Sequence, residues 1–489
     1  MRSLTTVSTY RTQAILGLFF VLINGLLFTF AHDSRPYPGG PLLSPTYHAA
    51  ADGQRYWGVA VSLAETGSFT IPQLWDSRPE EPLQRSGPLP AIAFSIPIKF
   101  FGFDNAPIWI VTFQCLLVFV MGLLSRQIAD IFDTNSTLLQ ALILFNPNLI
   151  SLAHLAQSDI LFSFIFFSIL YLITKKILLY TRPRYFWFAI VGGLIGLLTL
   201  TRDIGLVVAI SLPIILILVC TMDRHPNTPP VKIIIRGCLL GSVAFLMVVT
   251  PWVIRNHTVF QSWVLTTGNT GQLQYILKTL HKQQYPDYPA KIVPQLTQLN
   301  IHRLLDEQNR SYCLLDSTNN PDCDTAIRNA HIGAILSYPP KLIFLSTIKA
   351  SIKTMLGGGT KRVANYLGLI PPENQRGTQL SPTPTGLLSA VSFSLIREQY
   401  GSLLLFALAM GFVIATRLSG GLGLYVSIKS QSFLSIHYLY LLLTVVLFVA
   451  YFVVATSRFR APVEPILMLY ATIGLVSIAR KLGIMESTH

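Results

Sequence analysis

Long apolar runs alternate with short polar segments along most of the chain. Many of these runs approach the length of about 20 residues that an α-helix needs to cross a bilayer. They predict an all-α, polytopic membrane protein with about ten transmembrane helices. The predicted spans are 14–30, 108–124, 138–155, 160–173, 186–200, 204–220, 233–250, 403–415, 433–455 and 463–478.

Basic residues concentrate in every second loop between these spans, which orients the chain. Because Lys and Arg favour the cytoplasmic side, the pattern predicts cytoplasmic termini and two large outer regions, 32–105 and 255–400. A cleaved signal peptide is the alternative interpretation of the first run. The loops assigned to the cytoplasmic side carry Arg126; Lys175, Lys176, Arg182 and Arg184; Arg224 and Lys232; Arg417 and Lys429; and Arg480 and Lys481.

The segment 86–103 tests the number of spans, because it is apolar but short and contains Pro88, Pro90 and Pro97. If it crossed the membrane, every later basic loop would change sides. We therefore expect a helix that lies on the outer leaflet or dips into it. The division of the chain that follows is a transmembrane core (1–254), an outer region with an amphipathic helix (255–400) and C-terminal transmembrane helices (401–489).

The composition supports a membrane protein and argues against a nucleic-acid partner. Of the 489 residues, 51% are hydrophobic and 12% are charged, and the mean hydropathy is +0.53. This excludes a soluble protein. A net charge of +14 would favour nucleic-acid binding in a soluble protein, but here the cations lie mostly in short loops, as orientation signals do. We expect a multi-pass protein of the inner (plasma) membrane.

The five cysteines fall into two groups. Cys313 and Cys323 bracket a short polar loop, which suits a disulfide bond in an oxidising compartment; two free thiols are the alternative. A zinc site is not expected, because no His or Cys stands at ligand spacing from them. Cys115, Cys220 and Cys238 lie in apolar spans and are expected to be small buried hydrophobic residues.

A segment of the second outer region, 337–359, predicts a basic amphipathic helix. Lys341, Lys349 and Lys353 lie on an otherwise apolar helix that follows two prolines and precedes three glycines. Such a helix could bind membrane lipids and contact their anionic phosphates. Lysines that merely extend toward water from a surface helix are the alternative.

Charged residues also gather at the predicted outer ends of the spans, where each is costly unless it has a role. In the first outer region, Trp57, Val61 and Ala64 have helical spacing, and Asp52 stands at the head of this helix. Five outer segments thus offer charges to one aqueous cavity. The residues are Asp52 and Arg55, Asp159 at the fourth span, Arg202 and Asp203 in a turn, Arg255 after the seventh span, and Arg458 and Arg460 before the last span.

Five stretches match motifs of one enzyme family. Two stretches fit sequence motifs: PWVIRNHTVF fits PW-x-x-RN-x-x-x-F, and SRFRAPVEP fits a late R-[FY]-R-x-P-x-x-P motif. Three others fit structural features of the family: ADGQRYWGVAV fits its first outer loop, QSDILFS fits the start of its fourth span, and TRDIGLV fits a turn between two spans. They resemble the type C glycosyltransferases (GT-C), in particular the lipid A aminoarabinose transferase and protein O-mannosyltransferase branch. The resemblance covers 16–480, weakly through 273–338. It implies a GT-C-like bundle and a polyprenyl-phosphate-linked sugar donor.

The chain departs from that branch where the resemblance would imply a divalent metal. Gly53 stands where the branch usually has Glu, and Arg85, Ser86, Gly87 and Pro88 stand where the aminoarabinose transferases have a Glu-Lys-Pro. The sequence therefore does not support the divalent metal that the resemblance implies, although such a metal stays an open alternative, and the residues predict no other cofactor.

The chemistry of sugar transfer accounts for the charge pattern. A base must take the proton of the acceptor hydroxyl. Such proton transfer typically increases the reaction rate by a factor of about 10² to 10⁴. Cations must stabilise the phosphate that leaves, and one displacement inverts the anomeric carbon. The expected roles are catalysis for Asp52; phosphate binding for Arg458, Arg460, Arg255 and Lys353; and substrate binding for Arg55, Tyr56, Asp159, Arg202 and Asp203.

Two other functions remain open. One is a catalytically inactive GT-C relative, favoured by Gly53. The other is a transporter or flippase of a lipid-linked sugar, which would need ionisable groups midway along several spans. The residues also have structural alternatives: helix caps for Asp52 and Asp159, a mutual pair for Arg202 and Asp203, an outer rim for Arg458 and Arg460, and a buried structural role for His154.

Overall fold

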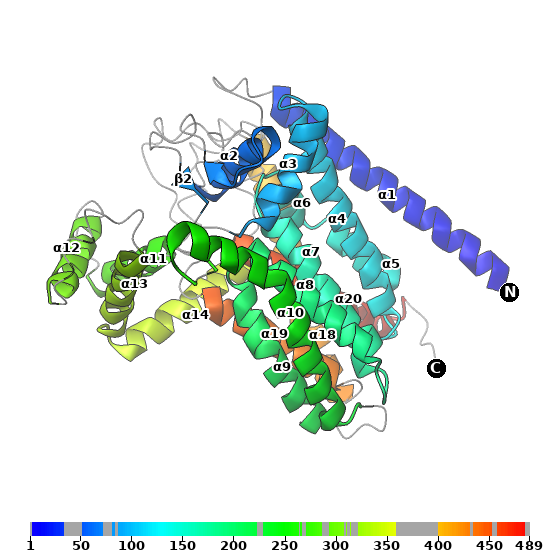
Figure 1. Cartoon of the computed structure of the whole chain (residues 1–489). Helices are drawn as coiled ribbons and strands as arrows, with labels where there is room; N and C mark the ends of the chain where they lie inside the picture. The colour runs from blue at the N-terminus through cyan, green and yellow to red at the C-terminus, as the bar shows by residue number, and fades with distance from the viewer. Residues whose placement is uncertain are drawn as a thin grey trace.

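The chain folds into an all-α bundle with a cap of shorter helices, as a computed structural model shows (Figure 1). The described ends of the chain lie at the end of the bundle opposite to α2 (Ala51–Glu65) and α3 (Leu89–Phe101). We call the end that carries α2 and α3 the loop end. The structure describes residues 2–33, 51–71, 81–83, 87–222, 228–263, 265–266, 270–285, 293–307, 310, 313, 321–357, 400–430, 434–451 and 457–484.

Seven described helices are long and apolar enough to cross a membrane, or eight if the bent pair α5 and α6 forms one span. Two shorter apolar helices, α8 and α19, coincide with the remaining predicted runs. The bounds are α1 (Arg2–Asp33), α4 (Ala106–Ala129), α5 (Ser136–Leu144), α6 (Pro147–Ala153), α7 (Asp159–Leu172) with the π-helix η3 (Ile173–Leu178), α8 (Tyr185–Thr201), α9 (Gly205–Met222), α10 (Val231–Phe260), α18 (Tyr400–Ser430), α19 (Leu434–Tyr451), and α20 (Glu464–Lys481) preceded by the 3-10 helix η6 (Ser457–Val463).

The bend between α5 and α6 has a local cause. Pro147 cannot continue a helix from the residues before it, but it fits the first position of a new one. The side chain of Asn146 accepts hydrogen bonds from the backbone N–H groups of Asn148 and Leu149, at 2.9 and 3.2 Å. Asn146 therefore caps α6, and the two helices meet at an angle of 48°.

Helix α18 differs from the prediction. We expected a span to end at residue 415 and Arg417 to lie in a cytoplasmic loop, but α18 runs without a break from Tyr400 to Ser430. The Arg417 side chain is only 13% exposed and pairs with Glu464. The prediction was wrong because a cation inside a span is tolerated where an anion on another helix neutralises it.

Two helix pairs pack with their backbones in contact. A Cβ atom added to Gly192 of α8 would lie 1.9 Å from the carbonyl oxygen of Gly241 in α10, and one added to Gly423 of α18 would lie 1.9 Å from that of Tyr470 in α20. Small residues permit such close packing in membranes. The main core extends from Phe20 to Tyr470 and contains α19 and α20 together with α4, α7, α8 and α9, so the first and last transmembrane segments share one core.

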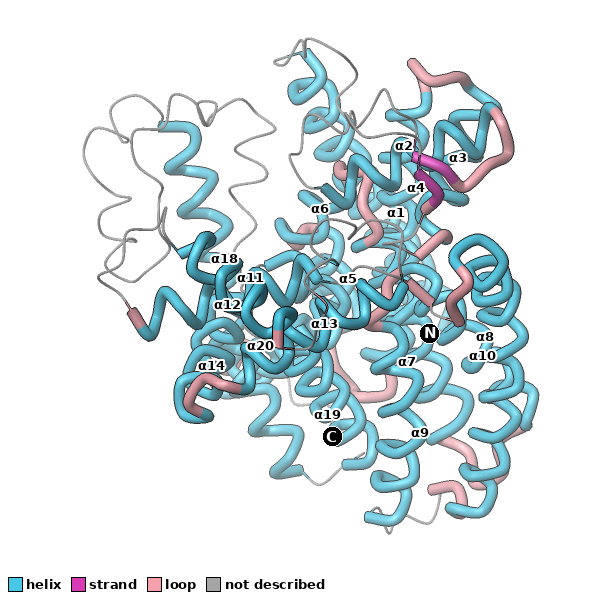
Figure 2. The backbone as a smooth tube through the Cα atoms, turned by 60° about the vertical axis from the view of Figure 1, so that its left-hand side comes forward, coloured by secondary structure: helices cyan, strands magenta, loops and turns pink. Residues whose placement is uncertain are grey.

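The loop end carries two groups of elements, which Figures 1 and 2 show beside the bundle. The strands of the first group pair antiparallel, two residues each. The second group has its own apolar core, which includes Cys313 and Cys323. The first group is α2 (Ala51–Glu65), β1 (Thr70–Ile71), β2 (Glu81–Pro82) and α3 (Leu89–Phe101); the second is α11 (Thr270–Gln284), α12 (Val293–Asp306), α13 (Pro321–Leu336) and α14 (Pro340–Leu356).

Helix α3 is the short, proline-containing segment that we expected at the membrane surface. Its 13 residues rise about 20 Å, which is less than the hydrocarbon thickness of a bilayer. It buries Phe94 and Ile98 against α2 and α4 and exposes Ile96 and Phe100. An apolar face away from the bundle suits a helix lying in the interface.

Candidate functional site

Three charged residues from separate segments meet at the loop end. Asp159 accepts a hydrogen bond at Oδ1 from Nη1 of Arg202, at 2.6 Å, and one at Oδ2 from Nε of Arg458, also at 2.6 Å. The carboxylate is 1% exposed, whereas the Arg202 and Arg458 side chains are 11% and 14% exposed. We call these three residues the Asp159 cluster. One carboxylate and two guanidinium groups leave it with a net charge of +1.

Helix ends bring the three together. Asp159 is in the first turn of α7, Arg202 follows α8 in extended conformation, and Arg458 lies in η6. Ser158, not Asp159, is the residue before α7, so the capping alternative for Asp159 gives way to an ion-pair role. A carboxylate is also favoured at a helix N-terminus by the helix dipole. The guanidinium of Arg202 further lies 5.5 Å from the centre of the Phe459 ring.

Helix α2 is attached to the same place. The hydroxyl of Tyr56 donates to Oγ of Ser158 at 3.2 Å, and Trp57 is fully buried behind it. Gly53 lies against the backbone of Ala156, with 3.6 Å from its Cβ position to the carbonyl oxygen. The first turn of α2 therefore lies beside the residues that precede Asp159.

Three other predicted residues, Asp52, Arg55 and Asp203, belong to this region. The backbone of Asp52 lies in the first turn of α2, while its side chain is outside the described residues. Arg55 and Asp203 are half-buried and have interactions of their own. The structure thus brings together Tyr56, Asp159, Arg202 and Arg458 and places the backbone of Asp52 near them.

Gly87 adds a tight contact between the first outer region and α8. A Cβ atom at this position would lie 2.1 Å from the carbonyl oxygen of Leu200. No side chain fits there without displacing the backbone next to Arg202. Among the described residues, no three His, Cys, Asp or Glu side chains gather.

A second ion cluster, missed in the sequence, surrounds Glu464. The fully buried carboxylate pairs with Arg460 at 2.5 Å and with Arg417 at 3.0 Å. The side-chain amides of Asn146 and Asn148 donate to it at 3.1 and 3.4 Å. We call these five residues the Glu464 cluster. The spacing of Arg460 and Glu464, four residues apart, was the available signal.

The position of Arg460 corrects the predicted phosphate site. Its side chain is 1% exposed, and besides Glu464 it donates to the backbone carbonyls of Thr354 and Met355. Alternate residues of η6 therefore serve different clusters: Arg458 pairs with Asp159, whereas Arg460 is enclosed with Glu464. Arg460 does not contribute to an accessible anion site in this structure.

Arg255 also lies elsewhere than predicted. It donates to the carbonyls of Leu83 and Phe69, at 2.9 and 3.3 Å, and its guanidinium lies 4.7 Å from the centre of the Trp252 ring. These bonds attach the end of α10 to the strand region of the first outer loop. Arg255 also donates to Oδ1 of the adjacent Asn256 at 2.9 Å. These contacts with oxygen atoms of the protein favour a structural role for Arg255.

Lys353 lies in the last turn of α14 and is half-buried. Burial lowers the pKa of its ammonium group below the usual 10.5, and the positive charge of Lys349 lowers it further. An anion bound beside Lys353 would oppose both effects. A phosphate could therefore reach the half-buried Lys353, whereas Arg460 is enclosed with Glu464.

Solved structures of two enzymes are similar to the chain. ArnT from Cupriavidus metallidurans, in the apo state, is 13% identical, with 96% of this chain and 79% of that chain covered and a TM-score of 0.38. Its structure with undecaprenyl phosphate is 14% identical with the same coverage and a TM-score of 0.36. The oligosaccharyltransferase of Archaeoglobus fulgidus, in the apo form, is 13% identical, with 96% and 51% covered and a TM-score of 0.49.

The chain spans about half the length of the archaeal enzyme. No family model and no curated protein matches the chain.

Two further sequence predictions concern structural residues. Cys313 and Cys323 form a disulfide bond with 4.9 Å between their Cα atoms. His154 is fully buried, and its Nε2 lies 3.1 Å from Oδ1 of Asn24 in α1. This contact agrees with the structural alternative for His154.

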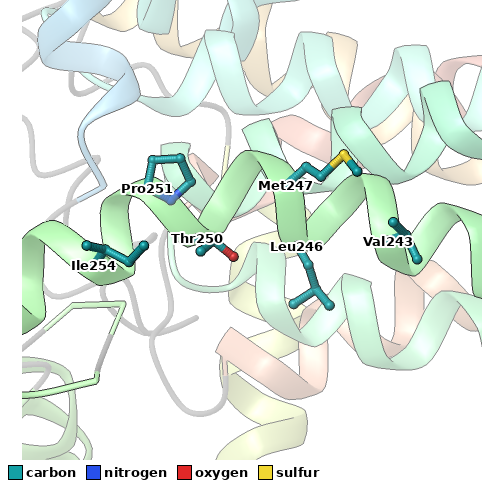
Figure 3. Close-up of a pocket in the computed structure, with 6 residues that line it drawn as sticks. All are labelled: Val243, Leu246, Met247, Thr250, Pro251 and Ile254. Carbon is teal, nitrogen blue, oxygen red and sulfur yellow. The ribbon is translucent and has the colours of Figure 1, made fainter.

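An open cavity of about 690 Å³ lies along α10 (Figure 3). Its side chains come from one helix and are mostly exposed and apolar, as on a surface that faces lipid. It contains no member of either ion cluster and is not the candidate site. The lining residues are Val243, Leu246, Met247, Thr250, Pro251 and Ile254.

Proposed function

We propose that the chain is an inverting glycosyltransferase that moves a sugar from a polyprenyl-phosphate carrier to an envelope acceptor. The observation that carries this proposal is the Asp159 cluster. One buried carboxylate holds two guanidinium groups in place at the loop end of a membrane bundle. Oriented, partly exposed arginines suit an anion with several oxygens, because guanidinium binds phosphate through two parallel hydrogen bonds.

Asp159 acts here as an orienting group. Its two oxygens each accept a hydrogen bond from an arginine, which favours its ionised form and removes it as a proton acceptor. The residual positive charge of the cluster then stabilises the phosphate as negative charge develops on the leaving oxygen. Lys353 adds a second source of positive charge from α14.

The proton acceptor in this proposal is Asp52. The acceptor hydroxyl attacks the anomeric carbon, the bond from that carbon to the phosphate oxygen breaks with its electron pair going to the phosphate, and the hydroxyl proton goes to Asp52. The Tyr56 to Ser158 hydrogen bond supports this assignment, because it fastens α2 beside Asp159. The proposal keeps Arg55 and Asp203 as residues that bind the sugar or the acceptor.

We infer further that the loop end faces the outside of the plasma membrane and that both termini are cytoplasmic. The basic loops between spans and the Cys313–Cys323 bond support this orientation. Lys341, which is exposed on α14, should react with a membrane-impermeant amine reagent in intact cells. Reaction only after lysis would reverse the orientation.

The assay combines the purified full chain with a radiolabelled polyprenyl-phosphate sugar and a crude envelope acceptor. We expect label in the acceptor and release of free polyprenyl phosphate, and neither with the Asp52→Asn variant. An inactive relative would bind the donor and release nothing. Movement of intact donor across a vesicle membrane, without cleavage, would instead establish a transporter.

A further inference from the structure

We propose that Glu464 is a positioning residue: through Arg460 it holds the last turn of α14, and with it Lys353, beside the segment that carries Arg458. This inference rests on the proposed function for its effect on donor binding. The placement itself can be measured without any transfer activity.

Side chains from outside α14 bind the carbonyl groups at its C-terminus. The last carbonyl groups of a helix lack partners within the helix and carry a partial negative charge. In α14, Arg460 donates to the carbonyls of Thr354 and Met355, at 2.7 and 2.5 Å, and Nε of Arg417 donates to Met355 at 3.3 Å. Two guanidinium groups from outside α14 therefore cap its C-terminus.

Glu464 holds the two arginines that cap α14. Two cations with 1% and 13% exposure need a counter-charge, because an unpaired buried charge is strongly destabilising. Glu464 pairs with both, and Asn146 fixes its Oε2 atom from the start of α6. Removing the Glu464 charge would therefore release the arginines, and with them the cap on α14.

Side-chain packing alone anchors the C-terminal half of α14 poorly. Its large apolar residues point away from the protein, with Ile348, Ile352 and Leu356 exposed by 42%, 53% and 43%. The residues turned inward are small or polar, such as Ala350 and Thr354. Little apolar area holds the last turns in place, so the polar cap supplies much of the attachment.

The same group of residues connects α14 to η6. Asn148, which also binds Glu464, donates to the backbone carbonyl of Ser457 at 2.9 Å. Gly357, at the end of α14, has 3.1 Å between its Cβ position and the Cβ atom of Ser457. Arg458 follows directly. One network thus positions both the lysine-bearing turn and the arginine that pairs with Asp159.

The test that does not depend on activity measures lysine reactivity. The full chain in lipid nanodiscs is treated with an amine reagent, and the labelling rates of Lys353 and Lys341 are compared by mass spectrometry. In Glu464→Gln, the rate at Lys353 relative to Lys341 should rise about fivefold, because local opening exposes the last turn. An unchanged ratio would overturn the proposal.

The matched control is Glu307→Gln. Arg303 and Glu307 have the same spacing as Arg460 and Glu464, but their side chains are 70% and 61% exposed. This substitution should leave the labelling ratio unchanged. A rise equal to that in Glu464→Gln would show a general loosening of the second outer region, and would count against a role for the buried cluster.

Arg460→Lys serves if Glu464→Gln does not fold. It keeps the positive charge beside Glu464, but a single nitrogen cannot hold the carboxylate and both carbonyls of α14 as the guanidinium does. Lys353 should again become more reactive. Unaltered reactivity in a folded Arg460→Lys protein would overturn the proposal as well.

Kinetics separate positioning from a general structural role. Glu464→Gln should raise the donor KM about tenfold with a much smaller change in kcat, and the same change made in a Lys353→Met background should add little, as for residues that act as one unit. Equal effects in both backgrounds would refute action through Lys353. If the wild-type chain transfers no sugar, the proposed function fails, and the labelling ratio still decides the placement.

Discussion

The Nε atom of Arg458 lies 2.6 Å from Oδ2 of Asp159, although 299 residues separate the two in the chain. With Arg202 on the other carboxylate oxygen, Asp159 joins the starts of α7 and η6 to the end of α8. The cluster is therefore a structural junction, and in the proposed function it is also the anion site.

The first prediction concerns Asp159→Asn. An amide cannot balance two guanidinium groups, so we expect loss of transfer and a loss of unfolding free energy of about 3 kcal/mol, typical of a broken buried ion pair. Thermal unfolding in detergent measures the second effect. Asp104→Asn, at an exposed position, should change neither quantity. Full activity of Asp159→Asn would remove the cluster from the mechanism.

The second prediction concerns Asp52→Asn. Loss of the proposed base should lower the transfer rate by about 10² to 10⁴ and leave donor affinity within about twofold, because the base acts on the acceptor proton. Radiolabel transfer and equilibrium donor binding provide the two values. Wild-type turnover would leave Asp52 as no more than a helix-capping residue.

The third prediction separates Arg458 from Arg255. Arg458→Ala should weaken donor binding about 10- to 100-fold, as expected for losing a hydrogen bond to a charged group. Arg255→Ala should leave the affinity within about threefold and instead make the first outer region more sensitive to protease, because its bonds to Phe69 and Leu83 are lost. The opposite pattern would restore Arg255 to the phosphate site.

The fourth prediction concerns pH. Because burial and Lys349 lower the pKa of Lys353 below 10.5, its charge is lost at a lower pH than that of a free lysine. Donor affinity should therefore fall as the pH rises through the alkaline range below 10.5. In Lys353→Arg the fall should move to higher pH, because arginine stays charged. Identical profiles for the two proteins would exclude Lys353 from the site.

The fifth prediction concerns the Cys313–Cys323 bond. Reduction should add two hydrogen atoms to the intact mass of the purified chain. Replacing both cysteines by alanine should cost the second outer region about 2 to 4 kcal/mol of stability, seen as faster proteolysis of α11 to α13. An intact mass that does not respond to reductant would show free thiols.

Local signals predicted most of the secondary structure. The apolar runs coincide with helices because the length and composition of each run are properties of contiguous residues. The surface position expected for α3 and the bond between Cys313 and Cys323, ten residues apart, follow from the same kind of short-range information. The orientation rule also showed that charged residues lie at the outer ends of several spans. Three of these segments meet in the Asp159 cluster.

The sequence by itself determined that the chain is a helical membrane protein with charged groups at one end of its bundle, because hydrophobicity and charge are read residue by residue. Only the tertiary structure decided which charges pair. Arg458 pairs with Asp159, whereas Arg460, two residues later, is buried with Glu464 and Arg417. The physical reason is that an ion pair depends on the distance between atoms that folding brings together, and helix packing sets that distance.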